Sequence, residues 1–463
     1  MFSPTDLSWF YKSPFVSWME RYSIENPAEK KEIAEDPTMK LLAQKGDEFE
    51  AHYLKKLKSE YGNIVEINKK QDFEQAKSDT IKAIKSGADI IYQGALSKGN
   101  VRGFTDFLVK VQRPSKLGDF SYEVADTKLA RSPKPEYIIQ LSSYSEMLSE
   151  ILGMTPENFS IVLGSKEKID FRVDDFAAFY RRFKKAFEVF HNEFDPKCRP
   201  IPQTWESFGV WQECADEILK KSDHLVRIAG ISTSQIKKLE KAGINTVELL
   251  VNANPSSCPD TLEKSSFAKI IKQATLQNKS IAVGRTQFEL RVIDTDQSYG
   301  LQRLPPKCVD DVYFDMEGFP LADDGLEYLF GATFIDHGQL QFKDWWAVTK
   351  DKEKKAFEDW IDWAYARWTK NPMLHIFHYA AYEVTAMKKL MGAYMTREHE
   401  VDEFLRHGVF IDLYQVVKEA LIVGAESYSI KKLEGLYDFK RKGDVKNAAD
   451  SNFMFATWID LKD

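Results

Sequence analysis

The stretch "YEVADTKLAR", from Tyr122 to Arg131, places two acids and a lysine in an otherwise apolar segment that is typical of a β-strand. Successive side chains of a strand point to opposite faces, so residues two apart share a face. Asp126 and Lys128 therefore share one face, and Glu123 points to the other. We expect the chemistry of this strand, if it has any, to belong to the pair Asp126 and Lys128.

The segments around this strand predict an α/β unit. "ADIIYQGAL" and "VRGFTDFLVKV" are β-rich runs separated by the turn sequence "SKGN", which predicts a hairpin that contains Asp106. Apolar residues with helical spacing before the hairpin predict a helix that carries Glu50. "PEYIIQLSSYSEMLSEIL" predicts a helix that begins at Pro135, with Gln140 and Tyr144 four apart on one face.

An acid on a helix, an acid on a hairpin, a D-x-K strand and a Q-x-x-x-Y helix together resemble the RecB-like branch of the PD-(D/E)xK nuclease superfamily, over roughly residues 1–215. The resemblance implies a restriction-endonuclease-like domain in which Glu50, Asp106 and Asp126 bind one or two Mg²⁺ or Mn²⁺ ions. It also implies that Lys128 assists the attacking water. Gln140 and Tyr144 are then expected near the bound DNA strand.

The chain departs from the pattern of this family in two places. Phe49 stands before Glu50, where relatives commonly have a metal-binding histidine. Many relatives also hold an iron–sulfur cluster through four cysteines, but here Ser13 occupies the first position and only Cys214 matches a later one. We therefore expect no iron–sulfur cluster, and packing by Trp205 and Phe208 in its place.

The stretch "DHLVRIAGISTSQIKKLEKAGINTVELLV" resembles a helix-hairpin-helix unit, with its turn at Gly230 and a second glycine at Gly243. Such a unit holds a DNA phosphate with backbone N–H groups at a helix start. Ser232 occupies the position of the usual second glycine of the motif. Two interpretations stay open, namely a phosphate-binding role at Gly230 and a structural module that links two domains.

"VYFDMEGFP" places Asp315 and Glu317 on one face of a strand that opens a second α/β pattern. Paired carboxylates of this kind bridge metal ions in phosphoryl hydrolysis, and flanking apolar residues suggest that the strand is buried. The pattern resembles an RNase H-like exonuclease of the DEDD type, which implies Asp315, Glu317 and Glu383 as metal ligands. The last acidic motif of that family does not occur after Lys446, so we expect this domain to be C-terminally incomplete.

The composition limits the class of protein. The 463 residues are 43% hydrophobic and 29% charged, with a net charge of −7, which fits several folded domains and excludes a protein that coats nucleic acid by bulk positive charge. No run is long and apolar enough to span a bilayer, and the four cysteines form no C-x-x-C pair. We expect no membrane association and a cytoplasmic location.

We expect three domains: a nuclease domain in residues 1–200, a helical linker in 201–300 and an RNase H-like domain in 301–463. This combination resembles a bacterial RecB-like nuclease family that is often joined to a superfamily 1 helicase. It implies a Mg²⁺- or Mn²⁺-dependent DNA nuclease that acts on single strands or ends, with a helicase domain or partner, in repair or antiviral defence. The alternatives are a catalytically dead nucleic-acid-binding scaffold of a helicase or defence complex, and an RNA nuclease.

Overall fold

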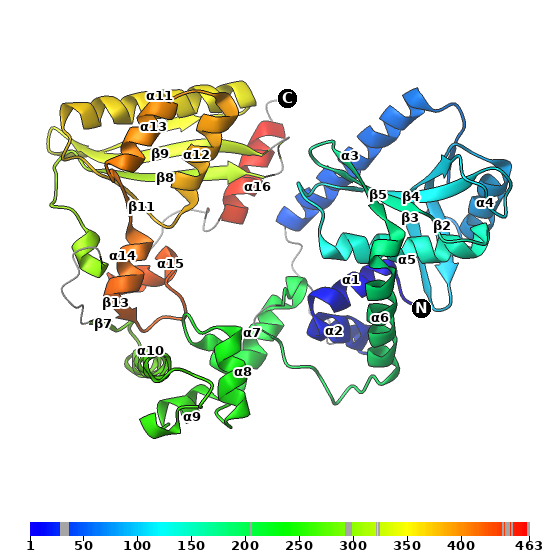
Figure 1. The fold of residues 1–463 in the computed structure, drawn as a ribbon. Coiled ribbons are helices and arrows are strands. Elements are labelled where there is room, and N and C mark those ends of the chain that lie inside the picture. Colours follow the sequence, from blue (N-terminus) through cyan, green and yellow to red (C-terminus); the bar gives the residue numbers. More distant parts are fainter. Residues whose placement is uncertain are drawn as a thin grey trace. The chain divides into compact units, whose positions relative to one another are not determined.

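The computed structural model describes residues 1–27, 37–203, 206–291, 299–320, 322, 325–437, 439, 445 and 448–460 (Figure 1). Contacts divide the chain into two compact units, Met1–Ile218 and Leu219–Asp463. Both are α/β units built on a mixed sheet, as the sequence predicts. The expected domain boundaries near residues 200 and 300 stay predictions. Among the described residues, no helix is both long and apolar enough to cross a membrane.

The first unit is built on a six-stranded sheet in the order β1-β2-β3-β4-β5-β6. Its strands are β1 (Ile64–Glu66), β2 (Ile90–Lys98), β3 (Val101–Val111), β4 (Ser121–Lys128), β5 (Asn158–Leu163) and β6 (Lys168–Arg172). Its helices are α1 (Pro4–Lys12), α2 (Pro14–Glu25), α3 (Pro37–Glu60), α4 (Phe73–Ser86), α5 (Pro135–Leu152) and α6 (Val173–Asn192), and α7 (Gln212–Lys221) begins in this unit. The order of elements from α3 to α5 confirms the predicted helix, hairpin, strand and helix.

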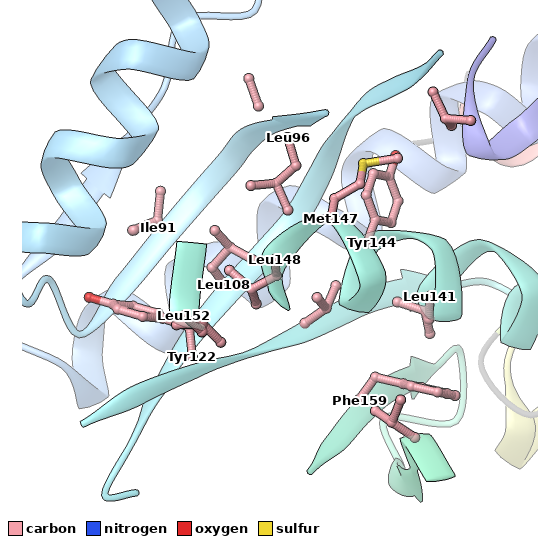
Figure 2. Packing of buried hydrophobic residues seen from close by; sticks show 14 of the residues in the cluster. Ile91, Leu96, Leu108, Tyr122, Leu141, Tyr144, Met147, Leu148, Leu152 and Phe159 are labelled. Atoms are coloured by element: carbon pink, nitrogen blue, oxygen red, sulfur yellow. The ribbon is translucent and has the colours of Figure 1, made fainter. Parts of the chain in front are cut away.

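Two faces of this sheet have different partners. Ile91, Leu108 and Val124 belong to a large apolar core that includes residues of α4, α5 and α6. Figure 2 shows α5 side chains, among them Leu141 and Leu148, packed beside the strands in that core. Residues of the alternate parity, such as Ala125, pack on the other face against α3. The sheet is therefore buried on both sides, and a charged residue within it needs a compensating partner.

Local sequence signals explain where several of these helices begin. Ser3 and Asp6 form a capping box at the start of α1, and Pro135 occupies the first turn of α5. The sequence of α6 predicts one stripe of core aromatic residues, made of Phe176, Phe179, Tyr180, Phe183, Phe187 and Phe190. Phe187 is fully buried, but Phe179 is 49% exposed, so the stripe is narrower than the sequence suggests.

The positions considered above for an iron–sulfur cluster contribute to packing here. Ser13 is buried, caps α2 and donates its hydroxyl to Glu206 at 2.8 Å. Phe208 packs edge-on against Phe15 at 5.7 Å between ring centroids, and Cys214 lies beside the same apolar group. Trp205 lies outside the described residues. These contacts join the segment after α6 to the N-terminal helices.

His191, near the end of α6, is almost completely buried. Its Nε2 lies 2.9 Å from Ser17 Oγ, the ring contacts Phe2 and Phe187, and Arg21 donates to its carbonyl oxygen. Burial, and then the Arg21 charge, lower the pKa of His191 from 6.5 to about 4. The imidazole is therefore neutral in the folded protein at neutral pH.

We expect this histidine to make the first unit sensitive to mild acid. The imidazole of His191 takes up a proton near pH 6.5 in the unfolded chain but only near pH 4 in the folded chain. The stability that neutral His191 contributes is therefore complete above pH 6.5 and is lost as the pH falls from 6.5 to about 4. Between pH 7 and pH 5 the free energy of unfolding should fall by about 1–2 kcal/mol more in the parent than in His191→Gln. Urea unfolding at both pH values measures the difference, and parallel losses in both proteins would contradict the assignment.

The second unit contains a five-stranded sheet in the order β10-β9-β8-β11-β12 and a small two-stranded sheet of β13 and β7. Its strands are β7 (Phe288–Leu290), β8 (Val312–Phe319), β9 (Leu326–Asp336), β10 (Gln339–Trp346), β11 (Ile376–His378), β12 (Phe410–Asp412) and β13 (Leu421–Val423). Its helices are α8 (Thr233–Lys241), α9 (Val247–Val251), α10 (Lys264–Val283), α11 (Lys350–Lys370), α12 (Tyr382–Tyr394), α13 (Glu398–Arg406), α14 (Leu413–Ala420), α15 (Ile430–Leu433) and α16 (Ala448–Asp460).

Within the larger sheet, β8 pairs antiparallel with β9 and parallel with β11, so the sheet is mixed. Its core is built around Trp360 of α11 and Met387 of α12, which pack with Phe314 of β8. The order of strands and helices from β8 to α12 confirms the second α/β pattern predicted from the sequence. Residues 225–274 form a separate apolar cluster that includes Leu239 and Phe267, so this helical part has a core of its own.

Candidate functional site

In the sheet of the first unit, the pairing of β3 with β4 ends next to the two predicted aspartates, Asp106 and Asp126. β3 and β4 pair from Val111↔Ser121 to Phe107↔Ala125, and the ladder ends there. β4 continues to pair with β5 through Lys128, and β3 continues to pair with β2. Beyond Ala125, the N–H of Thr127 donates to Asp106 Oδ2 at 3.0 Å instead of to a strand carbonyl. At this end of the sheet, the Asp106 carboxylate thus takes the place of the backbone hydrogen bonds between β3 and β4.

Asp126 and Lys128 lie on the same face of β4, as strand parity predicts. Lys128 Nζ is 2.5 Å from Asp126 Oδ2 and lies over the ring of Tyr137 of α5. Burial and the neighbouring Asp106 raise the pKa of the Asp126 carboxyl well above its ordinary value, and the two carboxyls are close enough to share a hydrogen bond. Burial alone lowers the pKa of Lys128, but the carboxylates of Asp126 and Asp106 outweigh it and raise that pKa.

Glu50 reaches this group of acids from α3 on the other side of the sheet. Gln93 of β2 donates its side-chain Nε2 to Glu50 Oε1, and the Tyr92 hydroxyl also hydrogen bonds to Glu50. Burial, followed by the Asp106 charge, raises the pKa of Glu50. The structure therefore brings together Glu50, Asp106 and Asp126 as electrostatic neighbours, with Asp106 in the middle.

Sequence reasoning missed Gln93. This residue has a backbone φ of +58° inside a strand, a left-handed conformation that costs a non-glycine residue about 1–2 kcal/mol. Its side chain is 3% exposed, and its Oε1 is buried with no hydrogen-bond partner among the described residues. The available signal was a lone polar residue in the apolar run "DIIYQGAL", directly before a glycine.

The two residues of the Q-x-x-x-Y helix have different surroundings. Tyr144 is buried and donates its hydroxyl to the carbonyl of Phe104 at 2.7 Å. A methyl group at Gly103 would meet that hydroxyl at 2.9 Å, so the glycine gives Tyr144 the room to approach the hairpin. Gln140 is partly exposed and hydrogen bonds to Tyr144. Tyr144 supports β3, and Gln140 is the more accessible of the two.

The donor atoms near the break in the sheet suit a hard divalent cation. Among the described residues, no three His, Cys, Asp or Glu side chains are gathered as the ligands of one metal ion. The acids present offer only oxygen donors, and the buried carboxyl of Asp126 and the half-buried Asp106 repel each other, which a cation relieves. The unpartnered buried oxygen of Gln93 is a further donor of the same type. The chemistry of the donor set therefore fits Mg²⁺ or Mn²⁺.

In the second unit, the predicted acids are less enclosed than the sequence suggests. Asp315 is exposed, although flanking apolar residues predict a buried strand, because Tyr313 and Asp315 lie on the solvent-facing parity of β8. The cost of burial therefore gives no reason to expect a cation at Asp315. Glu317 is half-buried, and burial together with Asp315 raises its pKa.

Glu383 is buried at the start of α12, where its Oε2 lies 3.4 Å from His378 Nδ1. The pKa of the preceding residue, Tyr382, is raised by burial, by its hydrogen bond to Glu327 and by the charges of Glu327, Glu317 and Glu383. Tyr382 donates its hydroxyl to Glu327 Oε2 at 2.7 Å. Sequence reasoning missed both Glu327 and Tyr382, since they belong to no recognised motif.

The turn at Gly230 is exposed and left-handed, with φ of +77°. The helix after it is capped by its own residues, because Ser232 accepts from the N–H of Gln235 and Gln235 accepts from the N–H of Ser232. The N–H of Ala229 donates to Gln277 at 2.8 Å. These bonds occupy N–H groups that a phosphate would need, which favours the structural interpretation of this turn.

Comparison with known proteins concerns the second unit. The chain matches no curated protein. A family model described as the RNase H superfamily matches residues 312–463, the region that contains Asp315, Glu317 and Glu383, and it covers none of residues 1–311. The match agrees with the RNase H-like part of the resemblance inferred from "VYFDMEGFP". Residues 312–463 are therefore an RNase H superfamily domain.

Proposed function

We propose that the protein is a metal-dependent nuclease that hydrolyses phosphodiester bonds of DNA, with its working centre in the first unit. The observation that carries the proposal is the end of the β3–β4 ladder, where the half-buried Asp106 meets the buried carboxyl of Asp126 beside Lys128. Such a group of acids with an adjacent cation is typical of sites that act on phosphate. The RNase H superfamily domain supports a nucleic-acid nuclease in general.

Each residue of this centre has a role that its contacts support. Asp106, Asp126 and Glu50 would hold Mg²⁺ or Mn²⁺, in the arrangement of a PD-(D/E)xK domain. A bound cation of this kind lowers the pKa of water and offsets charge on the scissile phosphate. Lys128, whose raised pKa keeps it protonated, supplies a positive charge beside Asp126 for the phosphate or the attacking water.

The proposed nucleic-acid contacts are Gln140, which is partly exposed at the start of α5, and, with less support, the exposed turn at Gly230. Tyr144 would have a supporting role, since its hydroxyl donates to the carbonyl of Phe104 and so fixes the β2–β3 hairpin. In the second unit, Asp315, Glu317 and Glu383 would form an exonuclease-like site of the DEDD type. We further propose that the protein works on single strands or ends beside a helicase, in repair or defence.

The test is digestion of end-labelled single-stranded DNA, double-stranded DNA and RNA by the full chain with Mn²⁺ or with a chelator. We expect cleavage of DNA that requires the divalent ion. A variant with Asp315→Asn and Glu317→Gln shows which unit carries the cleavage activity. If the first unit is the working centre, this variant should cleave as the parent does. Absence of cleavage by the parent would favour the scaffold alternative, and cleavage confined to RNA would favour the RNA nuclease.

A further inference from the structure

Gln93 combines two features that are unfavourable in a residue with only a structural role. Its backbone is left-handed although it lies within β2. The residues on either side of it pair with Phe107 and Thr105 of β3, so Asp106 is the residue of β3 that stands opposite Gln93. Its buried Oε1 has no hydrogen-bond partner among the described residues. Strained backbone and unsatisfied buried polar groups persist where function requires them, so together they point to a ligand.

The contacts of the amide show where such a ligand would be. The Nε2 atom donates to Glu50 Oε1, and both polar atoms of an amide are bonded to one carbon. The orphaned oxygen therefore lies next to the Glu50 carboxylate, in a residue that stands opposite Asp106. A donor hydrogen would satisfy this oxygen, but so would a cation, and the surrounding acids favour the cation.

We propose that Gln93 is a positioning residue for the acids of the first unit, and that its Oε1 is an additional, neutral ligand for the divalent cation. The inference rests on the proposed function and deepens it. An amide oxygen is a hard donor that suits Mg²⁺ or Mn²⁺. Because it is neutral, it adds a ligand without adding charge to a group in which Asp106 and Asp126 already repel each other.

The test measures Mn²⁺ binding rather than cleavage. Titration of Mn²⁺ into the full chain, followed by electron paramagnetic resonance of the free ion, gives the dissociation constant. All proteins carry Asp315→Asn and Glu317→Gln, so that this carboxylate pair of the second unit does not contribute. Gln93→Gly is the main variant, because glycine accepts the left-handed backbone and only the side chain is lost. Gln93→Asn keeps an amide that is too short by one methylene to reach Glu50.

The control is Ser142→Ala on α5, which removes another buried side-chain oxygen that has no hydrogen-bond partner. We expect Mn²⁺ to bind about 10- to 100-fold more weakly to Gln93→Gly and Gln93→Asn, and unchanged to Ser142→Ala. Thermal unfolding without metal should show all three variants folded. Equal affinity in the parent and in a folded Gln93→Gly overturns the inference alone, whereas a parent that binds no Mn²⁺ overturns the proposed function and this inference with it.

Discussion

Asp126→Asn is expected to lose divalent-ion-dependent cleavage by on the order of 10³-fold or more, since a ligand that helps to neutralise phosphate charge contributes several kcal/mol to the barrier. The substitution preserves the shape of the side chain but removes the carboxylate that lies between Asp106 and Lys128. Initial rates on end-labelled DNA, with Mn²⁺ in excess, measure the loss. Circular dichroism and DNA binding of the variant should match those of the parent.

Glu123→Gln is the matched control, because it makes the same chemical change three residues earlier on the same strand. Glu123 Oε1 accepts from the backbone N–H of Asn158 at 3.0 Å and from its side chain at 3.2 Å, which ties β4 to the start of β5. We expect Glu123→Gln to cleave as the parent does and to lose about 1 kcal/mol of stability. Retention of full activity by Asp126→Asn, or equal loss in both variants, would remove the case for a site on this strand.

Gly164→Ala is expected to have the largest effect on stability. A methyl group at Gly164 would lie 2.5 Å from the carbonyl oxygen of Leu129, the residue that follows Lys128. Because the obstacle is backbone, the end of β4 or of β5 has to move, at a cost of about 2–3 kcal/mol. For a unit of this size we expect the unfolding temperature to fall by roughly 4–12 °C. Calorimetry of the full chain measures the shift, and displacement of Lys128 should lower cleavage as well.

Gly46→Ala provides the control for this substitution. Gly46 lies within α3, and no heavy atom lies within 4 Å of the position that a methyl group would take. Alanine favours the helical backbone over glycine by up to about 1 kcal/mol, so this variant should be as stable as the parent or slightly more stable. If Gly164→Ala unfolds together with Gly46→Ala, the close approach between Leu129 and Gly164 is not a feature of the protein in solution.

Much of the fold could be predicted because its elements have strong local signals. Two β-rich runs on either side of the turn sequence "SKGN" predict the β2–β3 hairpin. Pro135, followed by apolar residues with helical spacing, predicts α5. Strand parity alone placed Asp126 and Lys128 together. Burial was harder to predict, since Asp315 and Phe179 stand among apolar neighbours in the chain but face solvent in the fold. Tertiary packing decides which face of a strand, or which side of a helix, is buried against other elements.

The candidate site shows the same limit more clearly. The acids were found from the sequence because carboxylates in apolar strands are rare enough to stand out. Gln93 and Tyr92 were not found, because their importance depends on the contact between β2 and α3, and these elements meet only in the folded unit. Glu327 was missed for a similar reason, as its partner Tyr382 comes from an element 55 residues away in sequence.

The carboxylate that replaces the strand ladder has a consequence for how the protein can be observed. The Thr127 amide proton is protected by a side chain, Asp106 Oδ2, and not by a neighbouring strand. Its exchange with solvent deuterium is therefore governed by what Asp106 binds, while neighbouring amides of β4 report the stability of the sheet. One backbone proton near the end of β4 thus becomes a spectroscopic probe of the occupancy of the site.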